Sequence, residues 1–327
     1  MKQELKRRLI SLVEKDLIDI EAALHENLSP NLPLVKEIAG HLLFSGGKRI
    51  RPLLMLLSTR LCQYQGEDAI GFSTIFEYLH AATLLHDDVV DEAELRRGRP
   101  AAHTQWSRPK VVLTGDFLLA RSLSLAAKTG LPDIITVMAG ITEDMSQGEI
   151  EQMEQKGNAS LTEAQYMTVI QRKTAVLLQG ACKSGGILAR AGKEKEAALD
   201  AFGYHLGVAF QMADDLLDYT AQADTLGKNP GADIREGKLT LPLIKALENA
   251  SNEDLAWMLK IIADPHFNEN DFKKLQELLH HYKGIEYTEK MAAHHVSLAK
   301  QSLGAFTPCQ AMDTMMLIAD YAIARDV

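Results

Sequence analysis

The stretch that decides the fold is LLHDDVVD at residues 84–91, which RRG at residues 96–98 follows within a few positions. An apolar run with helical spacing leads directly into three carboxylates. On a helix, Asp87 and Asp91 lie one turn apart on the same face, where like charges repel and weaken the helix. Packing alone gives no reason for this arrangement, so the segment is predicted to be a helix that ends at a charged site.

A second segment of this kind, DDLLD at residues 214–218, lies 127 positions later (214 − 87). With Gln211 before it, the polar residues follow steps of three and four and form one stripe on an otherwise apolar helix. Two facing groups of carboxylates need cations, and Mg²⁺ is commonly held by a few carboxylates together with substrate phosphates. The candidate metal ligands are Asp87, Asp88, Asp91, Asp214, Asp215 and Asp218.

Composition favours helices throughout. Of the 327 residues, 46% are hydrophobic but only 6% are aromatic, and Leu, Ala, Ile and Met are plentiful. No segment alternates with the period of a strand, so we expect an all-α, single-domain helical bundle over residues 1–327. The net charge of −9 makes a nucleic acid an unsuitable partner.

The cysteines and the N-terminus bear on the compartment. Cys62, Cys182 and Cys309 are widely spaced and form no CxxC or Cys/His cluster, so neither a disulfide framework nor a zinc site is predicted. The first 28 residues carry charges throughout and hold no apolar core of signal-peptide length. No run reaches about 18 apolar residues, so no transmembrane helix is expected, and a reducing cytoplasm fits best.

The apolar periodicity places helices along most of the chain, and a glycine-rich loop with two lysines is expected at 222–240. We expect the helix at 161–190 to be interrupted by Gly180 and by the pair Gly185 and Gly186. The predicted helices are 2–27, 34–44, 52–64, 68–96, 110–127, 133–155, 161–190, 194–221 and 309–325.

Basic residues supply the other half of the site. In SGGKRIRP, at residues 45–52, glycines and cations lead into a helix N-terminus, an arrangement that suits an anion, although the spacing is not that of a Walker A loop. Simpler readings also exist: Arg96 and Arg97 could stabilise a helix C-terminus, and Lys173 could be a surface lysine. The candidate phosphate-binding cations are Lys48, Arg49, Arg51, Arg96, Arg97, Lys173, Lys228 and Lys238.

So many cations exceed what one phosphate needs and indicate two phosphorylated substrates. His80 shares a helix face with Thr83 and Asp87, so a site role and an ordinary core role are both open for it. No hydroxyl or thiol has a general base beside it in the sequence. The pattern therefore favours chemistry in which metal ions activate a diphosphate leaving group inside a dry cavity.

Three motifs carry a family resemblance. They are GGKRIRP at 46–52, DDVVD at 87–91 with RRG at 96–98, and FQMADDLLD at 210–218 followed by Gly-Lys pairs at 227–228 and 237–238. Together and in this order they resemble the motifs of the trans-isoprenyl (polyprenyl) diphosphate synthases. The resemblance runs from about residue 40 to residue 245 and is greatest to long-chain, octaprenyl-type enzymes.

The resemblance implies an all-α helical bundle around a deep central cavity, assembled as a homodimer. It implies an enzyme that joins isopentenyl diphosphate to an allylic diphosphate, farnesyl or geranyl, and whose product can pass to a membrane. It implies a cluster of about three Mg²⁺ ions per site, with Mn²⁺ as an alternative. The ions would be ligated by Asp87, Asp91 and Asp214, supported by Asp88, Asp215 and Asp218. The allylic diphosphate would be held by Arg96, Lys173, Lys228 and Lys238. The isopentenyl diphosphate would be held by Lys48, Arg51, His80 and Arg97. Thr174 and Gln211, together with Lys173, would act beside the developing carbocation.

Product length depends on the turn before Asp87. In the resembled family, bulky residues four and five positions before the first aspartate stop the growing chain. Here these residues are Thr83 and Ala82, both small, so a long product is expected. Ala232 departs from the pattern, because a second acidic residue before Asp233 is common there.

Other functions remain open at this point. A short-chain (C15 or C20) synthase is one alternative, although typical bacterial farnesyl synthases have four residues, and not two, between the aspartate pair and the last aspartate of the first group. The catalytic subunit of a heterodimeric synthase is another, because it would keep both aspartate groups. A terpene cyclase would share the first aspartate group but should lack the cations at Lys48 and Arg51. An HD-type metal phosphohydrolase would use His86 and Asp87, but it does not account for the second aspartate group.

Overall fold

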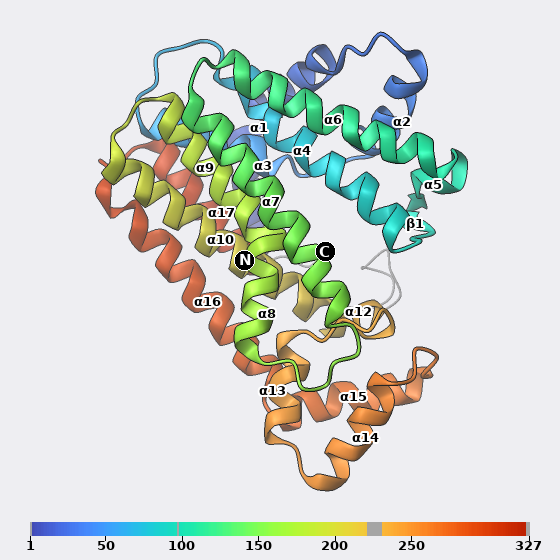
Figure 1. Ribbon diagram of the computed structural model, residues 1–327. Helices are drawn as coiled ribbons and strands as arrows, with labels where there is room; N and C mark the ends of the chain where they lie inside the picture. The colour runs from blue at the N-terminus through green and yellow to red at the C-terminus, as the bar shows by residue number, and fades with distance from the viewer. Residues whose placement is uncertain (1, 97, 221–230, 325–327) are drawn as a thin grey trace.

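The computed structural model describes residues 2–96, 98–220 and 231–324, and within them the chain is almost entirely helical (Figure 1). The prediction of an all-α fold is confirmed. The only strands in these ranges are the short antiparallel pair β1 (Leu95–Arg96) and β2 (Arg99–Pro100), which the apolar periodicity did not predict.

The helices form two groups around the long helix α10 (Figure 1). The first group is α1 (Lys2–Leu28), α2 (Pro33–Leu43), α3 (Ile50–Leu61), α4 (Ala69–Val90), α5 (Ala102–Gln105), α6 (Arg108–Lys128), α7 (Pro132–Glu154), α9 (Val176–Leu188) and α17 (Gln310–Ala324). The second group is α8 (Glu163–Ile170), α12 (Ala232–Arg235), α13 (Leu241–Asn249), α14 (Asn252–Ile262), α15 (Glu269–His281) and α16 (Gly284–Ser302). The π-helix η1 (Gln171–Ala175) joins α8 to α9, and the 3₁₀ turn η2 (Leu303–Ala305) follows α16.

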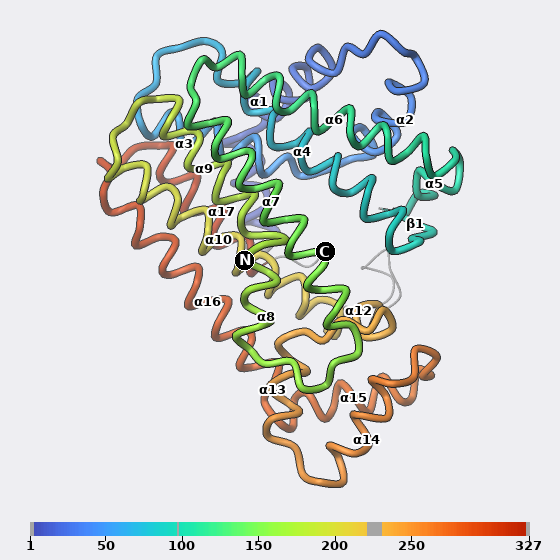
Figure 2. Tube along the Cα trace, in the orientation of Figure 1, coloured from blue at the N-terminus to red at the C-terminus, as the bar shows by residue number. Residues whose placement is uncertain are grey.

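Each group has its own apolar core, and α10 (Lys193–Thr220) contributes to both. Phe202 and Leu206 belong to the core that α1, α3, α4 and α9 share, while Met212 and Tyr219 belong to the core under α13 and α16. The trace shows α4 and α6 running side by side, and α10 between α9 and α16 (Figure 2). The division into one domain remains a prediction, which the shared helix favours.

The helix predicted at 68–96 is shorter than expected. It ends at Val90, because Glu92 takes a left-handed conformation with φ +52° and the amide of Ala93 closes back on the carbonyl of Asp88 at 3.1 Å. Arg96 therefore lies on a β-hairpin and not at a helix C-terminus. The reading of Arg96 as a helix-dipole cation was wrong.

The prediction for 161–190 also needs correction. The helix does not break at its glycines, which are instead points of close packing: a Cβ at Gly180 would lie 2.3 Å from Cδ1 of Ile141, and one at Gly185 would lie 2.6 Å from the carbonyl oxygen of Met55. The irregularity lies earlier, where residues 171–175 form one π-helical turn. The N-terminus is a capping box in which Thr162 and Gln165 satisfy each other's backbone amides.

The other predicted helices agree with the structure to within a few residues, as expected for helix ends. The predicted loop at 222–240 falls partly outside the described residues, and α12 interrupts the part that is described. In the described chain, no helix is long and apolar enough to cross a membrane.

Candidate active site

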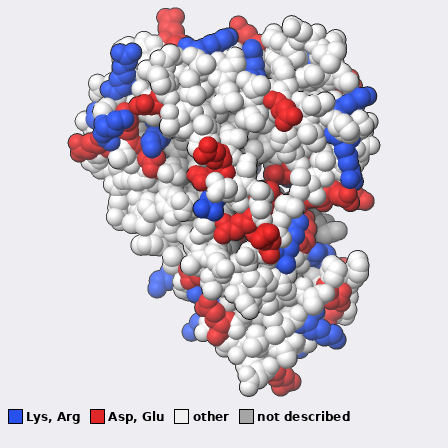
Figure 3. Space-filling view, in the orientation of Figure 1, with Lys and Arg blue, Asp and Glu red and all other residues white. Residues whose placement is uncertain are grey.

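In Figure 1, α4 ends beside β1 and α7 ends near α12. Ion pairs connect these segments: Asp91, at the C-cap of α4, pairs with Lys156 after α7, and Lys173 of η1 pairs with Glu149 of α7. Acidic and basic side chains gather in the middle of this face (Figure 3). In the chain that the structure describes, this region holds most of the residues predicted for the site.

Asp87 and Asp91 occupy the last turn of α4 and its C-cap. Burial raises the pKa of Asp87 to about 6, an effect that Glu149 reinforces and Lys173 opposes. Burial would also raise the pKa of Asp91, but Lys238 and Lys156 more than offset it and lower that pKa. The pKa values of two carboxylates one turn apart are thus shifted in opposite directions.

Asp88 points to the other side of the same turn. Its side chain is 1% exposed, and its Oδ1 accepts hydrogen bonds from Nε of Arg96, at 2.7 Å, and from Nη2 of the same guanidinium. Its Oδ2 is buried without a hydrogen-bond partner among the described residues. Arg96, predicted to hold a diphosphate, is thus tied to the helix that carries the first aspartates.

Lys173 lies on the π-helical turn, a feature often found at functional sites. Gly148 allows α7 to approach this turn, since a Cβ there would lie 2.8 Å from Cβ of Arg172. The close approach brings α7 side chains to Lys173, whose Nζ donates to Oε1 of Gln152 at 2.7 Å and forms an ion pair with Glu149. Sequence reasoning gave Glu149 and Gln152 no role, because their contact depends on this packing.

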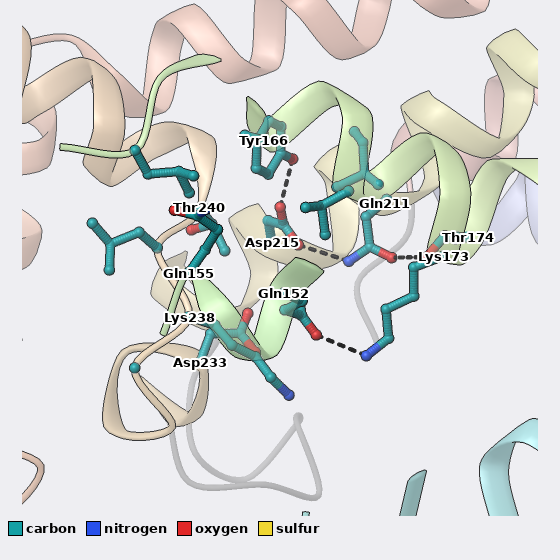
Figure 4. A pocket seen from close by; sticks show the side chains of 15 residues that line it. Gln152, Gln155, Tyr166, Lys173, Thr174, Gln211, Asp215, Asp233, Lys238 and Thr240 are labelled. Carbon is teal, nitrogen blue, oxygen red and sulfur yellow. Dashed lines mark hydrogen bonds between the residues drawn. The ribbon is translucent and has the colours of Figure 1, made fainter. Parts of the chain in front are cut away.

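The second aspartate group is held by a chain of hydrogen bonds (Figure 4). Thr174 donates to Oε1 of Gln211 at 2.8 Å, and Nε2 of Gln211 donates to Oδ1 of Asp215 at 2.8 Å. Tyr166 donates to Oδ2 of Asp215 at 2.6 Å. Asp215 is buried, and burial raises its pKa above the usual range, as does the nearby Asp233. The chain of bonds fixes the amide of Gln211 with its oxygen toward Thr174.

Tyr166 was not predicted as a site residue. A tyrosine two turns before Lys173 on the same helix was the available signal, but an apolar helix face explains such a residue equally well. Its hydroxyl matters only because the fold brings α8 against α10. Asp214, in contrast, is exposed at the surface of α10.

Asp218 organises the segment that follows α10. Its Oδ1 accepts from the amide of Ala232 at 3.1 Å and its Oδ2 from the amide of Asp233 at 3.2 Å, so it holds the start of α12.

Lys238, which follows α12, pairs with Oδ2 of Asp91 at 3.5 Å and with Glu236 at 2.6 Å. Burial would lower the pKa of Lys238, but Glu236 and Asp91 raise it, so the ammonium stays charged. Lys228 and Arg97 lie outside the described residues.

The glycine-rich loop before α3 contains one correction. Arg49 takes a left-handed conformation with φ 47° and is 5% exposed. Its guanidinium donates to Glu21 through Nε at 2.8 Å and to Glu77 through Nη1 at 2.8 Å. Arg49 is therefore committed to a buried ion-pair cluster, and the prediction that it binds substrate is withdrawn. Lys48 is exposed, with Nζ 5.8 Å from the ring centroid of Tyr321.

The remaining predicted residues lie on neighbouring helices. Arg51 is in the first turn of α3, and His80 is on α4, both partly buried. Thr83 is also partly buried and donates to the carbonyl of His80 at 2.9 Å, whereas Ala82 is 1% exposed in the core. The two residues predicted to set product length thus differ in burial: Thr83 is partly buried, and Ala82 is in the core.

A pocket of about 150 Å³ opens between the second aspartate group and the lysines (Figure 4). Its apolar wall comes from Leu161, Val169, Ile170 and Leu239. Its polar lining includes Gln152, Tyr166, Lys173, Thr174, Gln211, Asp215, Asp233 and Lys238. Apolar lining with a few converging charges is typical of a small-molecule site.

Comparison with known proteins identifies the family. The sequence matches the family model Polyprenyl synthetase over residues 32–279. The chain belongs to the polyprenyl synthetase family. It is 33% identical over 319 residues to the octaprenyl diphosphate synthase of Escherichia coli, covering 98% of both chains. It is 34% identical to the short chain isoprenyl diphosphate synthase of Methanothermobacter thermautotrophicus, covering 88% of this chain and 89% of that one.

A solved polyprenyl synthase has the same fold. The crystal structure of the polyprenyl synthase from Caulobacter crescentus, complexed with calcium and isoprenyl diphosphate, superimposes with a TM-score of 0.91 at 35% identity, covering 98% of this chain and 97% of that one. Membership of this synthase family removes the HD-type phosphohydrolase from consideration.

The carboxylates of this synthase fit divalent cations. Their oxygens are the hard donors that Mg²⁺ prefers, and two oxygens near Asp87, Oδ2 of Asp88 and Oε1 of Glu149, are buried without a hydrogen-bond partner within the described ranges. No three His, Cys, Asp or Glu side chains of the described chain converge closely enough to hold one ion by themselves. A site of this kind suits Mg²⁺ whose remaining ligands are substrate oxygens.

Proposed function

We propose that this synthase condenses isopentenyl diphosphate head to tail (1′-4) with an allylic diphosphate and releases pyrophosphate. The observation that carries the proposal is the position of Lys238. Its ammonium pairs with Asp91 of the first aspartate group, and it lines the same pocket as Asp215 of the second. Lys238 therefore connects the first aspartate group to the pocket that Asp215 lines, which supports a single site for a diphosphate with bound metal ions.

The chemistry follows from the arrangement of this site. The bond between C1 and oxygen of the allylic substrate breaks and its electron pair leaves with the diphosphate, whose negative charge would be neutralised by Mg²⁺ held on Asp87, Asp91 and Asp214. Lys173 and Lys238 bind the same diphosphate. The C4 end of the isopentenyl double bond then bonds to the allylic C1, which leaves the positive charge on isopentenyl C3. Loss of a proton from C2, with the released pyrophosphate as base, forms the new double bond between C2 and C3.

The hydroxyl and amide oxygens of Thr174 and Gln211 stabilise the positive charge that develops on the allylic carbons. Asp215 and Tyr166 support this function by fixing the orientation of Gln211. The apolar wall of the pocket limits access of water, which would otherwise capture the carbocation. Arg96 and Lys228 complete the allylic subsite, and Lys48, Arg51, His80 and Arg97 hold the isopentenyl diphosphate.

We propose a long-chain, all-trans product from a farnesyl or geranyl primer. The small side chains of Ala82 and Thr83 support this choice, as does similarity to a relative named as an octaprenyl diphosphate synthase. A short product is the second candidate, because another relative of similar identity is named as a short chain synthase.

We also propose that the synthase is a homodimer of the reducing cytoplasm. Large apolar side chains are exposed on the neighbouring helices α6 and α7, which supports a second copy as the partner. The three cysteines are free, as a reducing compartment favours. A heterodimer in which this chain is the catalytic subunit is the alternative, and a long product would pass to a membrane.

The test is incubation of the purified chain with Mg²⁺, farnesyl or geranyl diphosphate and labelled isopentenyl diphosphate, with the products sized by chromatography. We expect a ladder that ends in one long polyprenyl product, and no product in EDTA. Lack of any extension would show that the chain is not a self-sufficient synthase. A ladder that stops at C15 or C20 would reject the long-chain assignment alone.

A further inference from the structure

Asp91 lies between two lysines that come from different loops. Its Oδ1 is 3.2 Å from Nζ of Lys156, and its Oδ2 is 3.5 Å from Nζ of Lys238. Lys238 belongs to the motif that the family resemblance assigns to the allylic diphosphate. Lys156 follows the end of α7 and belongs to none of the recognised motifs.

The two loops are joined to each other. Gly157 directly follows Lys156, and Gly237 directly precedes Lys238. The amide of Gly157 donates to the carbonyl of Gly237 at 2.8 Å. Gly237 has φ +75°, and a Cβ there would lie 3.3 Å from the amide nitrogen of Gly157. The glycines therefore allow a close backbone approach that carries both ammonium groups to one carboxylate.

Asp91 would hold a divalent cation through the same carboxylate oxygens that now face the two lysines. Lys156 would then lose its partner. Lys238 keeps Glu236, at 2.6 Å, as a second partner, whereas the ion pair of Lys156 is with Asp91. The ammonium of Lys156, on a side chain that is 36% exposed and able to reorient, would be within reach of a diphosphate bound at Asp91.

We propose that Lys156 is a further binding residue for the diphosphate of the allylic substrate, which it contacts in place of Asp91 when divalent cations bind. This inference rests on the proposed function, because it takes the allylic diphosphate as the ligand at Asp91. The shared chemistry is that of any diphosphate bound through a metal ion, so inorganic pyrophosphate with Mg²⁺ is a direct probe.

The test compares wild type with Lys156→Met and Lys156→Arg by isothermal titration calorimetry with pyrophosphate in excess Mg²⁺. We expect Lys156→Met to bind pyrophosphate about 5- to 10-fold more weakly, the effect of one exposed charge-assisted contact, and Lys156→Arg to stay within about twofold of wild type. In steady-state assays, the KM for the allylic substrate should rise by a similar factor while the KM for isopentenyl diphosphate stays unchanged.

Lys183→Met is the matched control. Its ammonium is 40% exposed and pairs with Asp200 at 3.1 Å, nearly the same exposure and distance as at Lys156, but on α9 and α10 away from the aspartate groups. This variant should bind pyrophosphate like wild type. Unchanged pyrophosphate affinity in Lys156→Met overturns the assignment of Lys156, and a wild type that binds no pyrophosphate overturns it together with the proposed function. A third outcome separates the two proposals. If Lys156→Met binds pyrophosphate more weakly than wild type but wild type extends no primer, only the proposed function is overturned.

Discussion

Thr83 offers the sharper test of product length at the scale of single residues. It precedes Asp87 by one turn and is only partly buried, and its hydroxyl satisfies itself within α4. Thr83→Tyr should therefore shorten the main product by several isoprene units, with little change in melting temperature. Ala82→Tyr should also shorten the product, but it should cost about 1–3 kcal/mol of stability because Ala82 is buried in the core. Thr83→Ser is the control, and an unchanged ladder in Thr83→Tyr would mean that the growing chain does not pass this residue.

Which site residues could be found from the sequence depends on what made them visible. Asp87, Asp91 and Lys238 stand in patterns of charge that packing does not explain, so the sequence alone indicates them. Lys156 and Tyr166 look like ordinary surface and core residues, and only tertiary contacts bring them to the aspartates. Arg49 shows the converse error, since a cation in the right loop turned out to bind two carboxylates of the protein itself.

At the scale of elements, the contact between α10 and α16 should be sensitive to pH. Nδ1 of His205 and Nδ1 of His295 are 3.0 Å apart, with one ring donating and the other accepting. Burial, together with the nearby His205 and His294, lowers the pKa of His295 to about 4. Between about pH 6.5 and pH 4, His295 binds a proton in the unfolded state but stays neutral in the folded state. The free energy of unfolding therefore falls as the pH falls. The loss from this group reaches about 3 kcal/mol near pH 4 as an upper limit.

His295→Gln removes this titration and should flatten the decline. We expect the variant to melt below wild type at pH 8 and the difference to narrow or reverse by pH 4.5, as followed by circular dichroism. His266→Gln, at an exposed position before α15, is the control and should run parallel to wild type across the same range. A constant difference between wild type and His295→Gln at every pH would contradict the assignment of the depressed pKa to His295.

Element boundaries were predictable where local signals set them and not where packing did. The long helices such as α7 and α10 follow from apolar periodicity to within a few residues. The π-helical turn η1 and the hairpin β1–β2 did not follow from apolar periodicity, because each is accompanied by contacts with another segment of the chain. The close approach at Gly148 accompanies the first, and the pairing of Arg96 with Asp88 accompanies the second.

At the scale of the whole molecule, the proposed homodimer makes a prediction about α6 and α7. These helices expose Leu113 at 65% and Ile150 at 62%, together with Leu123, Ile135 and Met153. Burial of a large apolar side chain contributes about 1.5–3 kcal/mol, and a buried unpaired carboxylate costs more. The double variant Leu113→Glu with Ile150→Glu should thus raise the dimer dissociation constant at least about 100-fold.

Light scattering at micromolar concentration should then show a dimer for wild type and a monomer for the double variant. Ile18→Glu, on α1 at 63% exposure, is the control and should stay dimeric. A monomeric wild type would reject the homodimer, and a dimeric double variant would move the interface to another face.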